Sequence, residues 1–167
     1  MSNHKVAILM GSASDLPVME AAGDVLNDLG IGWRMAVRSA HRTPEETVAY
    51  VRKAEEDGVK VLICGAGMAA HLAGVVAAES LLPVIGVPIN ASLDGMDALL
   101  ATVQMPPGIP VATVAVGRAG AKNAAWLAAR ILSLVDTEVA ATLTAAKQAQ
   151  KEKVLASDAE LQARLNG

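Results

Sequence analysis

The sequence predicts a doubly wound α/β domain in which helices cover both faces of five parallel strands, with a helical segment projecting at the C-terminus. Short apolar runs alternate five times with segments of helical spacing. Strands that are apolar at every position are typical of a parallel sheet buried on both faces. Of the 167 residues, 53% are hydrophobic and 2% aromatic, so aliphatic side chains must build the core. A chain of this length buries about 70% of its unfolded surface, which favours one compact domain.

The first strand is expected over Val6 to Met10, an apolar run that ends at Gly11. A helix follows over Pro17 to Leu29, where apolar residues recur at helical spacing before Gly30. The second strand is expected over Trp33 to Val37, ahead of a polar turn.

The second helix has the sharpest start signal in the chain. Thr43 predicts an N-cap, Pro44 the first helical position, and Glu46 the acidic partner of a capping box. This helix should run to Asp57, because Gly58 follows it.

Three more strand and helix pairs complete the pattern. The best buried strand is Val59 to Cys64, and Ala69 to Leu81 continues it as a helix of small residues. The last two pairs are expected as strands over 83–87 and 111–116, with helices over 96–103 and 121–135. Right-handed crossovers then give a flavodoxin-like, doubly wound sheet. Its core should centre on Val6, Ile8, Val61, Ile63, Val84, Ile85, Val114 and Val116.

The C-terminal segment differs from the rest because no strand remains for it to cover. We therefore expect a catalytic α/β region over 1–135 and a helical arm of the same domain over 136–167. The segment is either a loosely held tail or an arm that packs on another subunit. Helical spacing of Val139, Leu143 and Ala146 favours the arm.

Composition excludes several classes of protein. With 14 basic and 17 acidic side chains, the net charge of −3 gives no strong field for gripping nucleic acid or an anionic membrane. The most apolar stretch, Ala73 to Ile89, is interrupted by Glu79 and two prolines, so no membrane span is expected. The lone Cys64 cannot form an internal disulfide, and no leader is apparent, which favours the cytoplasm.

The turns after the first and second strands carry polar side chains suited to a ligand. In an open parallel sheet, ligands bind beyond the carboxyl ends of the strands. The first turn reads Gly11-Ser12-Ala13-Ser14-Asp15 and suits an anion or sugar, although Ser14 or Asp15 could simply cap the next helix. The second turn, Ser39 to Pro44, sets His41 beside Arg42. Arginine can grip phosphate and histidine can exchange a proton near neutral pH, whereas the alternative is a solvated polar loop.

The third turn reads Gly65-Ala66-Gly67-Met68-Ala69-Ala70-His71. Its Gly-x-Gly-x-x-Ala string is typical of a dinucleotide-binding site. However, such a site needs an acidic residue about 20 residues later to bind the ribose, and that residue is absent. The turn instead offers a small-walled apolar niche capped by His71, which alone could be a surface or core histidine. No metal-ligand spacing, Walker A string or nucleophile elbow occurs, and Cys64 reads as a buried hydrophobe.

Together the three turns resemble the PurE family of purine biosynthesis. The resemblance extends from about residue 5 to 135, because Pro83 to Pro88, Gln104 to Pro110 and Ala121 to Ala125 match in the same order. It implies a mutase that moves a carboxylate from the exocyclic nitrogen of N5-carboxyaminoimidazole ribonucleotide to C4 of the imidazole. The implied reaction uses no ATP, biotin or metal, and it passes through trapped carbon dioxide.

The resemblance also implies roles for individual residues. His41 would be the catalytic acid and base, and a guanidinium at Arg42 would hold phosphate. The full set implied to contact substrate is Ser12, Ser14, Asp15, Ser39, Arg42, Gly65, Gly67, Ala70, His71 and Leu72. The close-walled stretch from Gly65 to Leu72 would keep carbon dioxide beside C4.

Two positions depart from the family pattern. Met68 stands where the pattern has a second glycine, and Ala73 stands where it has a proline. His71 favours the mutase over the related carboxylase, which takes aminoimidazole ribonucleotide and carbon dioxide directly.

The alternatives from other classes are a nucleotide-binding module without turnover and a nicotinamide-dependent oxidoreductase, which the missing acid disfavours. We also expect a homo-oligomer, for which the resemblance implies an octamer. The apolar composition and the C-terminal segment indicate more apolar surface than one such domain covers. The loop over residues 104–108 would then reach a neighbour's nucleotide.

Overall fold

The computed structural model describes residues 4–166. Its strands are β1 (Val6–Met10), β2 (Trp33–Val37), β3 (Val61–Gly67), β4 (Val84–Ile89) and β5 (Ala112–Thr113). Its helices are α1 (Leu16–Asp28), α2 (Pro44–Glu56), α3 (Leu72–Glu79), α4 (Met96–Val103), α5 (Arg118–Leu132) and α6 (Thr137–Asn166). Two short 3-10 helices, η1 (Ala13–Asp15) and η2 (Leu93–Gly95), precede α1 and α4.

The five strands form one parallel sheet in the order β2-β1-β3-β4-β5. Val6 of β1 lies opposite Trp33 of β2 on one side and Val61 of β3 on the other, and β3 also pairs with β4, so β1 and β3 are both interior strands. The order reverses between β1 and β3, which confirms the doubly wound, flavodoxin-like prediction. Loops that follow β1, β2 and β3 are therefore neighbours at one edge of the sheet.

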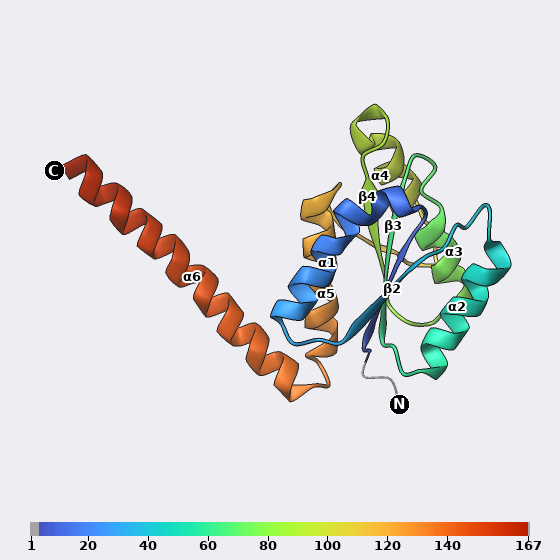
Figure 1. Ribbon diagram of the computed structural model, residues 1–167, viewed down its shortest axis with the longest axis horizontal. Helices are drawn as coiled ribbons and strands as arrows, with labels where there is room; N and C mark the ends of the chain where they lie inside the picture. Colours follow the sequence, from blue (N-terminus) through green and yellow to red (C-terminus); the bar gives the residue numbers. More distant parts are fainter. Residues whose placement is uncertain (1–3, 167) are drawn as a thin grey trace.

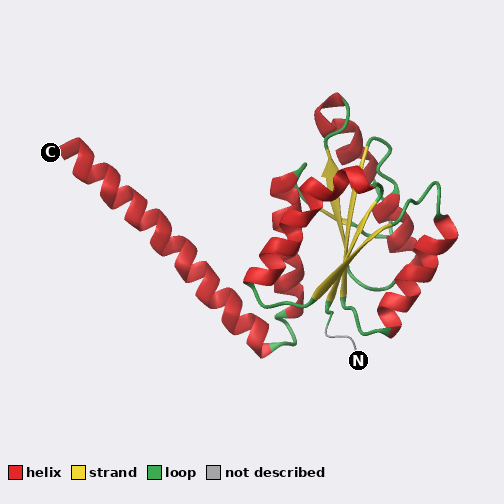
Figure 2. Cartoon of the chain, viewed as in Figure 1, coloured by secondary structure: helices red, strands yellow, loops and turns green. Residues whose placement is uncertain are grey.

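Helices cover both faces of the sheet (Figure 2). Ile8, Ile63 and Ile85 pack with α1 and α5 in one buried cluster. On the opposite face, Leu9 and Leu62 pack with α2 and α3 in a second cluster. This alternation is expected because successive strand residues point to opposite faces.

Six of the eight predicted core residues are buried, but Val114 and Val116 are only half-buried. The predicted strand over 111–116 is wrong in length, because β5 comprises two residues and pairs only with β4. Val114 and Val116 therefore lie beyond the end of β5, in the segment that leads to α5.

Two local predictions also need correction. The third strand begins later than predicted and continues to Gly67, and α3 starts at Leu72 because the backbone at Met68 turns left-handed (φ 54°). Thr43 is the N-cap of α2 with Pro44 beside it, as predicted, but its side chain makes no capping hydrogen bond. The Thr43 hydroxyl is instead committed to the backbone of Ser39.

The C-terminal segment is one 30-residue helix, α6, that leaves the body of the molecule (Figure 1). Its base is anchored: Val139 is buried, and Leu143 and Ala146 pack against the core beside α5. Asp136 pairs with Lys5 and accepts hydrogen bonds from the backbone N–H groups at the start of the helix. From residue 147 to 166 every side chain is exposed.

Cys64 lies in the middle of β3 with 1% of its surface exposed. Burial raises the pKa of its thiol far above the ordinary value, so the thiolate is not available. This agrees with the prediction of a buried hydrophobe. Among residues 4–166, no helix combines the length and apolar character needed to cross a membrane.

Candidate active site

A cavity of about 440 Å³ opens at the carboxyl ends of β1, β2 and β3. It is lined by all three loops that the sequence singled out. The predicted site residues on its wall are Ser12, Ser14, Asp15, Ser39, His41, Arg42, Gly67, His71 and Leu72. Chain segments about 60 residues apart thus converge where the sheet topology requires.

Two histidines from different loops meet at this cavity. The distance between His41 Nε2 and His71 Nδ1 is 2.8 Å, and the rings meet edge to face, at 84°. Such a hydrogen bond needs a proton on one nitrogen and a lone pair on the other. The pair can therefore pass a proton between the rings, an arrangement that the sequence alone did not indicate.

The first loop lines the cavity and is also held by hydrogen bonds between its own residues. The Ser12 N–H donates to Asp15 Oδ2 at 3.1 Å, and the Ser14 hydroxyl donates to Ser12 Oγ at 2.9 Å. Ser12 and Asp15 form a capping box on η1, whereas the capping of the following helix α1 that the sequence allowed is not found, because Asp15 makes no side-chain capping bond there. Burial raises the pKa of Asp15, and the hydrogen bond from Ser12 opposes that rise.

The second loop presents His41 and Arg42 to solvent from a tight turn. Ser39 Oγ accepts a hydrogen bond from the Arg42 N–H at 3.1 Å. The turn therefore holds a histidine and a guanidinium side by side at the mouth of the cavity.

The third loop supplies small residues, but not all those predicted. Gly65 and Ala70 do not reach the cavity wall. Gly65 is packed under Met19, where an added Cβ would lie 2.3 Å from the sulfur, and Ala70 is 1% exposed. Both positions govern packing beneath the loop.

The apolar part of the wall comes largely from other positions. Ala40, Ala66 and Ala91 line the cavity beside Leu72, and Ala91 belongs to the loop after β4. That loop was missed, although the pairing of β4 with β3 brings it to the same edge. A Cβ on Gly67 would lie 3.1 Å from Ala91 Cβ, so the two loops are in close contact.

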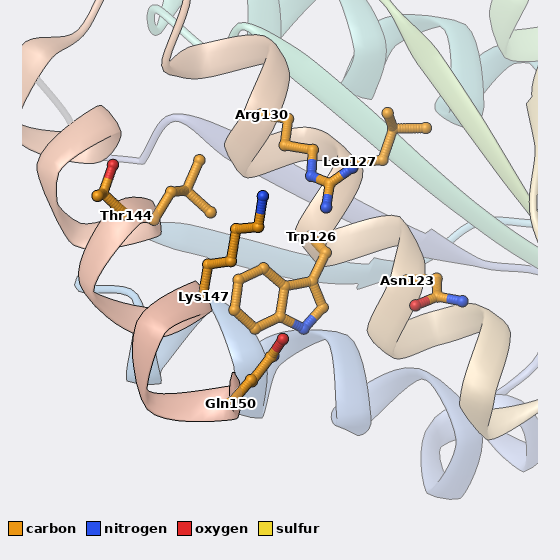
Figure 3. Close-up of a pocket in the computed structure, with 8 residues that line it drawn as sticks. Asn123, Trp126, Leu127, Arg130, Thr144, Lys147 and Gln150 are labelled. Carbon is orange, nitrogen blue, oxygen red and sulfur yellow. The ribbon is translucent and has the colours of Figure 1, made fainter. Parts of the chain in front are cut away.

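A larger concavity of about 740 Å³ lies between α5 and α6 (Figure 3). Trp126 and Arg130 of α5 face Lys147 of α6 across it. None of the three loops contributes to it, and its lining holds no acid and base pair. Over residues 4–166, no group of three or more His, Cys, Asp or Glu side chains could hold a metal ion. The loop cavity is therefore the candidate active site.

The fold and the position of the cavity place this protein in the class of doubly wound α/β proteins, which bind small-molecule ligands at the carboxyl ends of their strands. Residues 5–153 match the family described as AIR carboxylase, and the chain belongs to that family.

Curated relatives narrow the comparison. An N5-carboxyaminoimidazole ribonucleotide mutase of Pyrococcus abyssi is 59% identical over 136 residues, covering 81% of this chain and 77% of that protein. The mutase of the same name from Bacillus subtilis is 50% identical, covering 93% of this chain and 97% of the relative. A solved structure, Treponema denticola PurE, superposes with a TM-score of 0.85 at 35% identity over 93% of this chain and 97% of its own.

Proposed function

We propose that this chain is an isomerase of purine biosynthesis that converts N5-carboxyaminoimidazole ribonucleotide to 4-carboxy-5-aminoimidazole ribonucleotide. The main observation behind this proposal is the pair of histidines, with His41 Nε2 2.8 Å from His71 Nδ1, on the wall of a cavity that Arg42 also lines. The names of relatives about 50 to 59% identical to this chain support the same reaction.

The reaction needs one proton to change places. Cleavage of the carbamate C–N bond releases carbon dioxide and leaves its electron pair on the exocyclic nitrogen, which takes a proton. C4 then attacks the carbon dioxide and loses its own proton to restore the aromatic ring. We assign both transfers to His41, because one imidazole can give and then take a proton near neutral pH.

His71 contacts the ring that we assign to the proton transfers. Its Nδ1 lies within hydrogen-bonding distance of His41 Nε2, so it can orient that ring before substrate enters. The remaining polar residues, Ser12, Ser14, Asp15, Ser39 and Arg42, would hold ribose and phosphate. Asp15 suits a ribose hydroxyl because it is an acceptor at the cavity wall.

Carbon dioxide must remain beside C4 instead of escaping to solvent. A close apolar wall does this by excluding water and limiting the space available. Ala40, Ala66 and Leu72 supply such a wall, with Gly67 allowing the Ala91 loop to approach. We therefore place the carbon dioxide niche against these residues and not against Ala70.

One experiment separates the mutase from its alternatives. The purified chain is incubated with N5-carboxyaminoimidazole ribonucleotide and, separately, with aminoimidazole ribonucleotide plus bicarbonate. The mutase forms product efficiently only in the first mixture. Faster product formation in the second indicates a carboxylase, and binding without turnover in both indicates a nucleotide-binding module. Unchanged turnover after chelation would support our proposal that no metal is used.

We also propose a cytoplasmic homo-oligomer, with an octamer as the assembly implied by the resemblance. The exposed outer half of α6, which carries Val154, Leu155, Leu161 and Leu165, supports association, as does exposed apolar surface on α4. Light scattering of the parent and of a variant lacking residues 137–167 tests both parts. A monomeric parent contradicts the oligomer, and an unchanged assembly after truncation contradicts the arm.

A further inference from the structure

The turn that carries His41 is closed by a side-chain hydroxyl. Thr43 Oγ1 accepts a hydrogen bond from the Ser39 N–H at 3.0 Å and donates one to the Ser39 carbonyl at 3.1 Å. The Thr43 N–H also donates to that carbonyl, at 2.9 Å. Three hydrogen bonds thus join the two ends of a five-residue turn.

A second threonine supports this closure from below. Thr47 is 1% exposed, and its hydroxyl donates to the Thr43 carbonyl at 2.7 Å. In contrast, His41 and Arg42 at the tip of the turn are exposed. The tip has little packing of its own, so its position depends on how the ends are held.

We propose that Thr43 is a positioning residue that fixes His41 for proton transfer. The hydrogen bond between His41 Nε2 and His71 Nδ1 spans two loops at 2.8 Å, and it depends on the His41 turn keeping its place. Without the Thr43 hydroxyl, the Ser39 N–H loses its partner and water can compete for the turn. A displacement of about 1 Å at a reacting group can lower a rate by about 100-fold.

The inference rests on the proposed role of His41, and its test uses three hydroxyl deletions in the full-length protein. Thr43→Val keeps the side-chain shape and removes the two hydroxyl hydrogen bonds of the closure, while the backbone bond from the Thr43 N–H to the Ser39 carbonyl remains. Thr47→Val removes the supporting bond to the Thr43 carbonyl and a longer one, at 3.5 Å, to the Ser39 carbonyl. Thr102→Val is the matched control for Thr47, because Thr102 is also buried and its hydroxyl donates to the carbonyl four residues earlier at 2.7 Å, in α4.

The readout is kcat and KM for N5-carboxyaminoimidazole ribonucleotide, together with the midpoint of thermal unfolding. We expect kcat to fall by about 10- to 100-fold in Thr43→Val, with KM changed less than about threefold. Thr43→Ser should restore most of kcat because it restores the hydroxyl. Thr47→Val should lower kcat by a smaller factor, whereas Thr102→Val should lower the unfolding midpoint alone.

Parent-like kcat in Thr43→Val would overturn the inference, as would a loss confined to KM. If Thr43→Val does not fold, equal kcat values for Thr47→Val and Thr102→Val overturn it instead. His41→Asn in the same series distinguishes failure of the proposed function of His41 from failure of the proposed role of Thr43. Parent-like turnover by His41→Asn would contradict the assignment of His41 as acid and base. An inactive His41→Asn variant together with a parent-like Thr43→Val variant would contradict only the role of Thr43.

Discussion

The two loops that bring histidines to the cavity hold their shapes in different ways. The His41 turn is closed by hydroxyl and backbone hydrogen bonds from Thr43. The loop from Gly67 to His71 instead contains Met68 in a left-handed conformation and packs through small residues. This difference fits the roles that we propose: a turn fixed by hydrogen bonds for proton transfer, and a close wall for a small intermediate.

The largest expected effect belongs to the His41 turn. His41→Asn should lower turnover by at least about 100-fold while nucleotide binding persists, because an amide fills the space but cannot exchange a proton at neutral pH. His71→Asn should cost less, since His71 contacts His41 and is not assigned a transfer. Steady-state kinetics and binding titrations measure both. A larger loss of turnover for His71→Asn than for His41→Asn would mean that His71, and not His41, carries the proton transfers.

Arg42 on the same turn should act on binding. Arg42→Ala is expected to weaken nucleotide binding by about 2 kcal/mol, or about 30-fold, because the phosphate loses a charged donor. Calorimetry with the nucleotide and with its dephosphorylated analogue measures this. The analogue should bind the parent and the variant alike, and a large difference between them would refute the phosphate role.

Two alanines, Ala66 near the end of β3 and Ala70 in the loop that follows, should distinguish the cavity wall from the packing beneath it. Ala66 lines the cavity, so Ala66→Val should crowd the niche and let carbon dioxide escape, with aminoimidazole ribonucleotide accumulating. Ala70 is buried, so Ala70→Val should lower the free energy of unfolding by about 1–3 kcal/mol and leave the product ratio unchanged. Product ratios and urea unfolding distinguish them. If Ala70→Val changes the product ratio and Ala66→Val changes only stability, the carbon dioxide niche lies at Ala70 and not at Ala66.

The smallest effect concerns Met68. Its φ of 54° disfavours a residue with a Cβ, and Met68 is 60% exposed, so little packing is lost on its removal. Met68→Gly should therefore raise the free energy of unfolding by about 0.5–1 kcal/mol, as measured by urea titration. A less stable variant would mean that the methionine side chain contributes packing that exceeds its backbone strain.

Most of the fold was predictable because most of the strands are short apolar runs bounded by glycine or a polar turn. The predictions for Val6–Met10 and Trp33–Val37 match the structure residue for residue. The last strand, β5, was overestimated because hydropathy does not show where pairing with the neighbouring strand ends, which here is after Thr113.

The candidate site was predictable as three loops but not as a geometry. Sheet order brings His41 and His71 to one edge, yet their contact depends on turn shapes that no local pattern specifies. The same limit applies to Thr43, whose sequence context indicated a helix cap and whose hydroxyl bonds to the preceding turn. Ala91 was missed because the loop after β4 carries no motif.

The buried thiol of Cys64 can serve as a built-in probe of how often the sheet opens. The chain has one cysteine, it sits in a central strand, and burial raises its pKa, so a thiol reagent reacts only when the sheet opens. The labelling rate then reports how often β3 is exposed. Ligands that occupy the loop cavity should slow labelling, because they stabilise the closed sheet by mass action.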